Sequence, residues 1–101
     1  MAESFVQRRL RKGRVTLFKK AGCPYCGNAV EILKQHSFAH KCLKVVDITQ
    51  SEDVQEYLQQ ETGRSTVPYV FSEKRCIGGL ADLQSMRSDR PGILQQIGAL
   101  R

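Results

Sequence analysis

The feature that most constrains the fold is a pair of cysteines at the junction of two different hydrophobic patterns. The run Val15-Thr16-Leu17-Phe18 is short and apolar, which is typical of a buried strand. Cys23-Pro24-Tyr25-Cys26 comes soon after it, and apolar residues then recur at helical spacing at Ala29, Val30, Ile32 and Leu33. A strand, a tight turn with two cysteines and a helix together suit a reactive dithiol. Cys23 would lie at the positive end of the helix dipole, which favours its thiolate, and Cys26 about one turn further on.

Hydrophobic periodicity and turn residues predict the other elements. We expect strands over 15–18, 43–48, 68–71 and 75–77. We expect helices over 2–12 and 24–36, from a capping box at Thr49-Gln50-Ser51-Glu52 to Gly63, over about 80–86, and from Pro91 onward. The short polar turn 72–74 predicts an antiparallel hairpin, and the first strand–helix–strand segment predicts a right-handed parallel crossover. The sequence therefore predicts an α/β fold with a four-stranded mixed sheet and helices on both faces.

Length and charge narrow the possible functions. The 101 residues fit a single domain, 1–101, with an ordinary hydrophobic content of 41%. The net charge of +6 is scattered except near the amino end, where an amphipathic helix explains it, so we expect no nucleic-acid partner. No secretory signal or apolar run of about 18 residues is present, which predicts a cytoplasmic protein with no membrane partner. Structural disulfides are rare there, so the four cysteines indicate catalysis, metal binding or burial.

The Cys-x-x-Cys motif has three interpretations. Redox catalysis needs an attacking thiolate and a resolving thiol nearby, and both cysteines are present. A zinc site needs a second pair of ligands, but Val45 stands where the partner of Cys42 would be, so we expect no metal. Chance burial leaves the Pro-Tyr pair and the preceding strand unexplained. Cys42 and Cys76 have no partner at a motif spacing, and burial is the expected role of each.

Five further positions are compatible with either a functional site or ordinary structure. Lys20 precedes Cys23 by three residues, where a cation would favour the thiolate, although it is also an ordinary surface lysine. Pro68 begins a predicted strand, and because only about 5–6% of X-Pro bonds are cis, a trans bond is expected from the residues alone. Gly78 and Gly79 form a turn or allow close approach of a ligand. Asp82 falls in the first turn of a helix, where a carboxylate is favoured in any case.

Together these segments resemble the glutaredoxins, most closely the dithiol cytosolic type of vertebrates. The resemblance covers essentially the whole chain in order. Its matching segments are Lys20 with Cys-Pro-Tyr-Cys, Val46-Asp47-Ile48-Thr49, Gln55 within VQEYLQQ, Thr66-Val67-Pro68, CIGG followed by Asp82-Leu83, and the terminal QQIGAL.

The resemblance implies a thioredoxin-like fold and a glutathione-dependent thiol–disulfide oxidoreductase. Cys23 would be the nucleophile and Cys26 the resolving cysteine. Cys23 alone would reduce protein–glutathione mixed disulfides, and both cysteines would reduce protein disulfides. Glutathione would be a co-substrate, with no bound cofactor. The expected partners are glutathionylated or disulfide-containing proteins, with ribonucleotide reductase as one family-level candidate, and the protein would be a monomer.

The resemblance also implies a binding site for glutathione. Lys20 and Gln55 would hold its glycyl carboxylate, and Val67, before a cis Pro68, would pair its backbone with the peptide. Asp82 would take the γ-glutamyl amine, at a helix amino terminus that suits the γ-glutamyl carboxylate. The family's remaining binding positions correspond here to Tyr25, Thr66 and Gly79.

Several positions depart from the family pattern. Ser65 stands where Arg often precedes Thr-Val-Pro, and Arg64 is one place earlier, where an extended chain points to the opposite side. Tyr69 replaces a common Arg, Ala81 replaces a usual hydroxyl residue, and Gly22 and Gly27 flank the dithiol in place of larger residues. These changes predict weaker glutathione binding or a looser turn.

Two other functions of this fold remain open. An iron–sulfur carrier would use Cys23 with glutathione, but Pro24 and the intact Cys26 argue against it. A thioredoxin proper would be reduced by a flavoprotein, but thioredoxins typically carry Trp-Cys-Gly-Pro-Cys, and this chain has no Trp.

Overall fold

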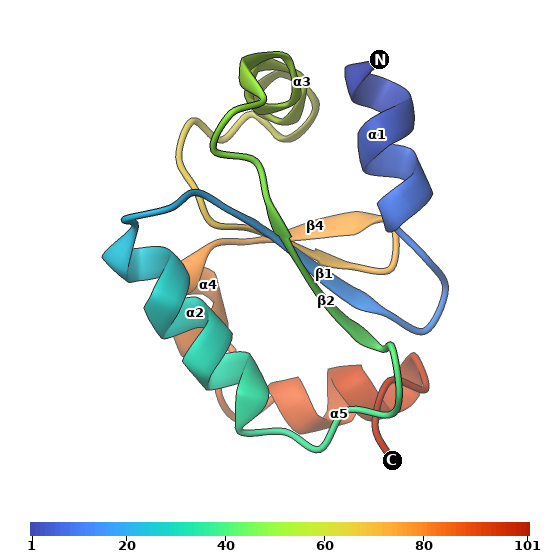
Figure 1. The fold of residues 1–101 in the computed structure, drawn as a ribbon. Coiled ribbons are helices and arrows are strands. Elements are labelled where there is room, and N and C mark those ends of the chain that lie inside the picture. The colour runs from blue at the N-terminus through green and yellow to red at the C-terminus, as the bar shows by residue number, and fades with distance from the viewer.

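A computed structural model, which describes residues 1–101, shows a central sheet between two layers of helices. The helices are α1 (Ala2–Arg9), α2 (Pro24–Lys34), α3 (Glu52–Thr62), α4 (Leu80–Ser85) and α5 (Arg90–Gln96). The strands are β1 (Val15–Lys19), β2 (Leu43–Asp47), β3 (Tyr69–Ser72) and β4 (Arg75–Gly78). In Figure 1, α1 and α3 lie over one face of the sheet, and α2, α4 and α5 lie over the other. The predicted α/β architecture is confirmed.

The sheet brings the dithiol and the Thr-Val-Pro segment to one edge. Its strand order is β2-β1-β3-β4, with β1 parallel to β2 and β3 antiparallel to both β1 and β4. Phe18 in β1 pairs with Tyr69 in β3. The chain that leaves β1 and the chain that enters β3 therefore meet, although they are far apart in the sequence.

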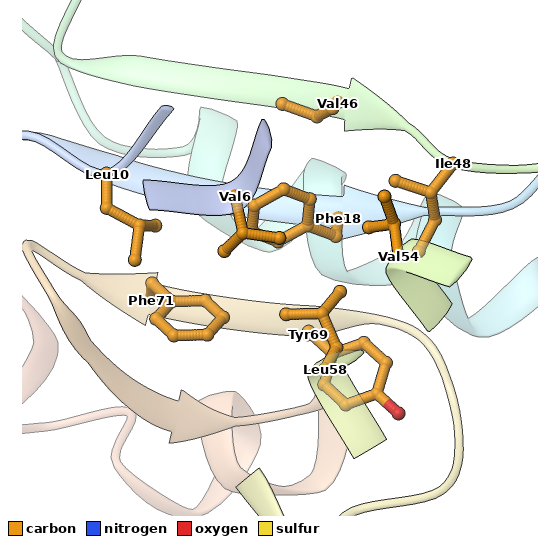
Figure 2. Packing of buried hydrophobic residues seen from close by; sticks show 9 residues of the cluster. All are labelled: Val6, Leu10, Phe18, Val46, Ile48, Val54, Leu58, Tyr69 and Phe71. Atoms are coloured by element: carbon orange, nitrogen blue, oxygen red, sulfur yellow. The ribbon is translucent and has the colours of Figure 1, made fainter. Parts of the chain in front are cut away.

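Alternation along the strands divides the core into two clusters. In β1, Val15 and Leu17 pack toward α2, α4 and α5, whereas Phe18 packs toward α1 and α3. Both faces are covered, which explains why β1 reads as a continuous apolar run. The rings of Phe18 and Phe71 meet edge to face, with 5.7 Å between centroids. Figure 2 shows the cluster on the side of α1 and α3, which is made of Val6, Leu10, Phe18, Val46, Ile48, Val54, Leu58, Tyr69 and Phe71.

Several local predictions need correction. The first helix ends at Arg9 rather than at residue 12, because Leu10 adopts an extended backbone and is buried in the core. The capping box is wrong: α3 begins at Glu52 after Ser51, and the Thr49 hydroxyl accepts a hydrogen bond from the Ala21 amide instead. The last helix begins one residue before Pro91.

The Val67–Pro68 peptide bond is cis. The trans bond expected from the residues alone is therefore wrong, and the cis bond implied by the glutaredoxin resemblance is confirmed. Pro68 is buried, and its carbonyl oxygen lies only 3.1 Å from where a Cβ on Gly79 would be. That packing comes from a distant segment and is not part of the local preference.

No helix has the length and apolar character needed to cross a membrane.

Candidate active site

Cys23 caps the amino terminus of α2. Its sulfur accepts a hydrogen bond from the Cys26 backbone amide at 3.1 Å, and Pro24 takes the first helical position, where no backbone donor is needed. The residue before it, Gly22, has a left-handed backbone with φ +73. Glycine therefore suits this turn, where the family pattern has a larger residue. The Cys23 sulfur receives a backbone donor in the positive field of the helix end, and a thiolate accepts such a bond more strongly than a thiol.

Cys26 has the opposite environment. It lies on the buried face of α2 with 1% of its surface exposed. Burial, followed by the hydrogen bond with Cys23, raises the pKa of the Cys26 thiol to about 11. At neutral pH Cys26 is therefore a protonated, inaccessible thiol, whereas the half-buried Cys23 is the cysteine that a substrate can reach.

Two hollows meet at Lys20. The first, of about 340 Å³, is lined by Cys23 and Cys26 with Lys20 and neighbouring residues of α2. The second is a groove of about 490 Å³ lined by Lys20, Gln55, Thr66 and Val67, and also by the carboxylates of Glu52 and Glu56. Four of the predicted glutathione-binding residues thus share one groove next to the dithiol. The Gln55 side-chain amide is oriented there by donating to the Ile48 carbonyl at 3.1 Å.

Pro68, Gly79 and Asp82 come together beside this groove. Asp82 Oδ2 accepts a hydrogen bond from the Gly79 amide at 2.9 Å. Gly78, with φ +124, has no room for a side chain, because a Cβ there would lie 2.2 Å from the Asp82 carboxylate. The two glycines therefore permit close approach of protein groups, Asp82 and the Pro68 carbonyl. Tyr25 lines neither hollow and is 66% exposed.

One polar residue at this site was not among the sequence-based candidates. Arg64 donates to Asp82, with 2.7 Å between Nη2 and Oδ2. The signal for it was present in the sequence as the one-residue shift of Arg before Thr-Val-Pro. Spacing alone did not show which group Arg64 would reach. Nowhere in the chain do three or more His, Cys, Asp or Glu side chains gather in a way that could hold a metal ion.

Comparison with known proteins agrees with this geometry. The sequence model of the glutaredoxin family matches residues 15–77. The chain is 54% identical to glutaredoxin-1 of Gallus gallus over 100 residues, covering 99% of each chain. It is 45% identical to glutaredoxin-1 of Homo sapiens over 106 residues, covering 100% of each. A crystal structure of a buckwheat glutaredoxin–glutathione complex superposes with a TM-score of 0.86 at 26% identity, covering 100% of this chain and 94% of that one.

The fold is thioredoxin-like, and a dithiol at the start of its first crossover helix defines a thiol–disulfide oxidoreductase. More narrowly, the chain belongs to the glutaredoxin family, whose members depend on glutathione for this reaction.

Proposed function

We propose that Cys23 carries the reduction of protein–glutathione mixed disulfides. The Cys23 thiolate attacks the glutathione sulfur, the protein sulfur leaves as a thiolate, and a Cys23–glutathione disulfide forms. The thiolate of a second glutathione then attacks the glutathione sulfur of that adduct. This step releases glutathione disulfide and restores the Cys23 thiolate. With protein disulfides, Cys23 would form the mixed disulfide and Cys26 would resolve it.

The contrast between the two cysteines carries this proposal. Cys23 Sγ accepts a backbone hydrogen bond at the end of an eleven-residue helix, whereas Cys26 is buried with a raised pKa. An attacking sulfur must be within reach of a substrate, and hydrogen-bond donors favour its thiolate; only Cys23 combines access with a backbone donor. Cys26 needs only to reach the Cys23 sulfur from one helical turn away.

We assign glutathione to the groove that adjoins Cys23. Lys20 and Gln55 would take the glycyl carboxylate, the Val67 backbone before Pro68 would pair with the cysteinyl residue, and Asp82 would take the γ-glutamyl amine. The family resemblance adds Tyr25, Thr66 and Gly79. The support is that Lys20, Gln55, Thr66 and Val67 line one groove, with Pro68, Gly79 and Asp82 in contact beside it.

Membership of the glutaredoxin family supports further expectations about oligomeric state, location, cofactor and substrates. Residues 1–101 would act as one domain and as a monomer in the cytoplasm, without a bound cofactor. The substrates would be glutathionylated or disulfide-containing proteins, ribonucleotide reductase among them. Size-exclusion chromatography with light scattering at several protein concentrations tests the monomer directly.

The test of the mechanism compares two serine variants on two substrates. Cys23→Ser is expected to abolish turnover of both a glutathionylated peptide and a protein disulfide. Cys26→Ser is expected to keep deglutathionylation and to lose most reduction of the protein disulfide. The assay couples glutathione disulfide formation to glutathione reductase, and Cys42→Ser is the matched control. Turnover of the glutathionylated peptide by Cys23→Ser would show that the assignment is wrong.

A further inference from the structure

An ion pair lies beside the cis-proline loop. Arg64, just after α3, directs Nη2 to Asp82 Oδ2 at 2.7 Å. The same Oδ2 also accepts the Gly79 amide, at 2.9 Å. A Cβ on Gly79 would lie 3.8 Å from Arg64 Nη2 and 3.1 Å from the Pro68 carbonyl oxygen. The guanidinium therefore sits next to the carboxylate that we assigned to the γ-glutamyl amine.

Tyr69 holds Arg64 in this position. The Tyr69 hydroxyl donates to the Arg64 backbone carbonyl at 2.7 Å, and Tyr69 itself is only 3% exposed. Tyr69 is the first residue of β3, so its ring is fixed by the sheet and the core. The two departures from the family pattern, the shifted arginine and this tyrosine, are thus joined by one hydrogen bond.

The ion pair leaves half of its hydrogen-bonding capacity unused. The Asp82 carboxylate makes its contacts through Oδ2, and Oδ1 has no hydrogen-bond partner. Arg64 uses Nη2, and its Nε and Nη1 donate to no protein group. The Arg64 and Asp82 side chains are 42% and 36% exposed, so a ligand can approach the ion pair from solvent.

We propose that Arg64 and Asp82 together recognise the two charged groups of the γ-glutamyl residue. That residue is the one part of glutathione that carries both a free α-ammonium and a free α-carboxylate. Asp82 binds the ammonium, and Arg64 binds the carboxylate. The planar guanidinium suits this role, because it offers paired donors to a carboxylate. The Gly79 amide is already used by Asp82, and Arg64 places a cation beside the same helix end, where it adds to the attraction for the carboxylate. This inference rests on the proposed function.

The alternative is that Arg64 blocks the site by competing with the ammonium for Asp82. An exposed ion pair contributes little to stability, because solvent screens it. Arg64 can therefore turn toward an incoming carboxylate at small cost, and as a blocker it would be weak. Arg64 therefore acts as a binding group for the α-carboxylate rather than as a blocker of Asp82.

The experiment compares two substrates that differ only in the α-carboxylate. One is a peptide carrying a glutathione mixed disulfide. The other carries an analogue in which 4-aminobutanoyl replaces the γ-glutamyl group, so that the amine stays and the carboxylate is gone. For Arg64→Gln we expect the KM of the glutathionyl substrate to rise about ten- to a hundredfold, as for loss of a hydrogen bond to a charged group, with kcat unchanged. The KM of the analogue stays the same.

Two further variants separate binding from general effects. Arg11→Gln removes the same charge from an exposed position between α1 and β1, and it is expected to change neither KM. Tyr69→Phe keeps the ring and removes only the bond to the Arg64 carbonyl. Because Tyr69 acts by positioning Arg64, this variant should raise the glutathionyl KM less than Arg64→Gln does, and again only for the substrate with the carboxylate.

Three results would overturn the inference. A lower glutathionyl KM in Arg64→Gln would show that Arg64 competes with the substrate. An equal change for both substrates would show a purely structural role, and no change for either would show that Arg64 does not contact the ligand. Failure of the proposed function itself looks different: the wild-type protein would then turn over cysteinyl and glutathionyl mixed disulfides equally well.

Discussion

At the scale of single residues, the two cysteines of one motif differ more than their spacing suggests. Cys23 is a helix cap that faces a hollow on the surface, and Cys26 lies on the buried face of the same helix. The helix geometry creates this difference, because a residue one turn further on points into the core while the cap remains outside. One motif thus supplies an accessible sulfur and a protected one.

The reactivity of Cys26 should follow its raised pKa. In a Cys23→Ser variant, burial remains the largest cause of the shift, so we expect iodoacetamide to modify Cys26 very slowly at pH 7 and faster as the pH rises well above 9. Mass spectrometry after timed quenching gives the profile, and the same variant in guanidinium chloride supplies the unshifted reference. A midpoint in the folded variant equal to the unfolded one would contradict the burial argument.

Gly78 should be indispensable for the placement of Asp82. In Gly78→Ala the new Cβ would lie 2.2 Å from the Asp82 carboxylate, at a φ of +124 that an alanine rarely adopts. We expect a loss of about 1–3 kcal/mol in the free energy of unfolding, as for overpacking, together with a raised KM for glutathionylated substrate. Urea unfolding measures the first effect and steady-state kinetics the second.

Gly27→Ala is the matched control for stability. Gly27 lies inside α2, and nothing is within 4 Å of the added Cβ. Alanine is the better helix former, so this variant should gain about 0.5–1 kcal/mol. If the two variants were equally destabilised, the clash with Asp82 would not be the cause in Gly78→Ala.

At the scale of elements, the chain between β2 and α3 supports the turn that carries the dithiol. The Thr49 hydroxyl donates to the Asp47 carboxylate and accepts the Ala21 amide at 2.7 Å. Ala21 lies two residues before Cys23, so a loop far along the chain holds the approach to the catalytic cap. The hydroxyl that the sequence pattern assigned to a helix cap serves this link between segments.

Thr49→Val should break the link and keep the shape of the side chain. The hydrogen bond from Thr49 is the largest cause that holds the pKa of the Asp47 carboxyl below its ordinary value of 3.8. We expect that pKa to move only part of the way back toward 3.8 in the variant, because the second cause, the hydrogen bond from the Thr49 amide, remains. A carboxylate with a lowered pKa stabilises the fold above pH 3.8, and this contribution is lost as the pH falls through the folded pKa. Carboxyl NMR titration measures the shift, and an unchanged Asp47 pKa would contradict the link.

At the scale of the whole molecule, the carboxyl end closes the fold against the segment that follows α2. The Ala39 amide donates to the Ala99 carbonyl at 2.8 Å, and the Arg101 amide donates to the Ser37 carbonyl at 2.9 Å. Near this junction Arg90 is buried, and its Nε and Nη1 have no hydrogen-bond partner. A buried guanidinium with two unpaired nitrogens costs stability, so Arg90 is expected to weaken this junction.

Arg90→Met should therefore stabilise the protein. Methionine keeps much of the side-chain length and removes the unpaired donors, and we expect a gain of about 1–3 kcal/mol in urea unfolding at pH 7. Lys34→Met, on the exposed surface of α2, removes one charge without relieving a buried donor and should give no comparable gain. A loss of stability in Arg90→Met would mean that the guanidinium has a compensating partner in solution.

The same junction predicts a pH dependence. Burial, and then the charge of Arg90, lowers the pKa of His36 below 6.5. The unfolded chain therefore binds a proton first, and stability falls as the pH drops from about 6.5 through the folded pKa. In Arg90→Met this loss should be smaller but still present, because burial remains. Urea midpoints between pH 5 and 7.5 test it, and an unchanged slope would exclude Arg90 as a cause.

Much of the fold was predictable because its determinants are local. The apolar runs of β1 and β3, the helical spacing after Cys26 and the left-handed Gly63 at the end of α3 all act within a few residues. The predictions that failed, such as the capping role of Thr49 and the length of the first helix, concern segment ends. There a distant partner or the core competes with the local preference.

In the candidate site, too, some features follow from the local sequence and others depend on contacts between distant segments. The sequence alone determined the class of chemistry, since two cysteines between a strand and a helix are sufficient to place one sulfur at the helix end. It also determined the family, through motifs that are contiguous in the chain. Only the tertiary structure decided that Cys26 is buried, that Val67–Pro68 is cis against the local preference, and that Arg64 pairs with Asp82. The physical reason is that each of these depends on atoms from segments distant in sequence, which meet only when the sheet and its two helical layers have assembled.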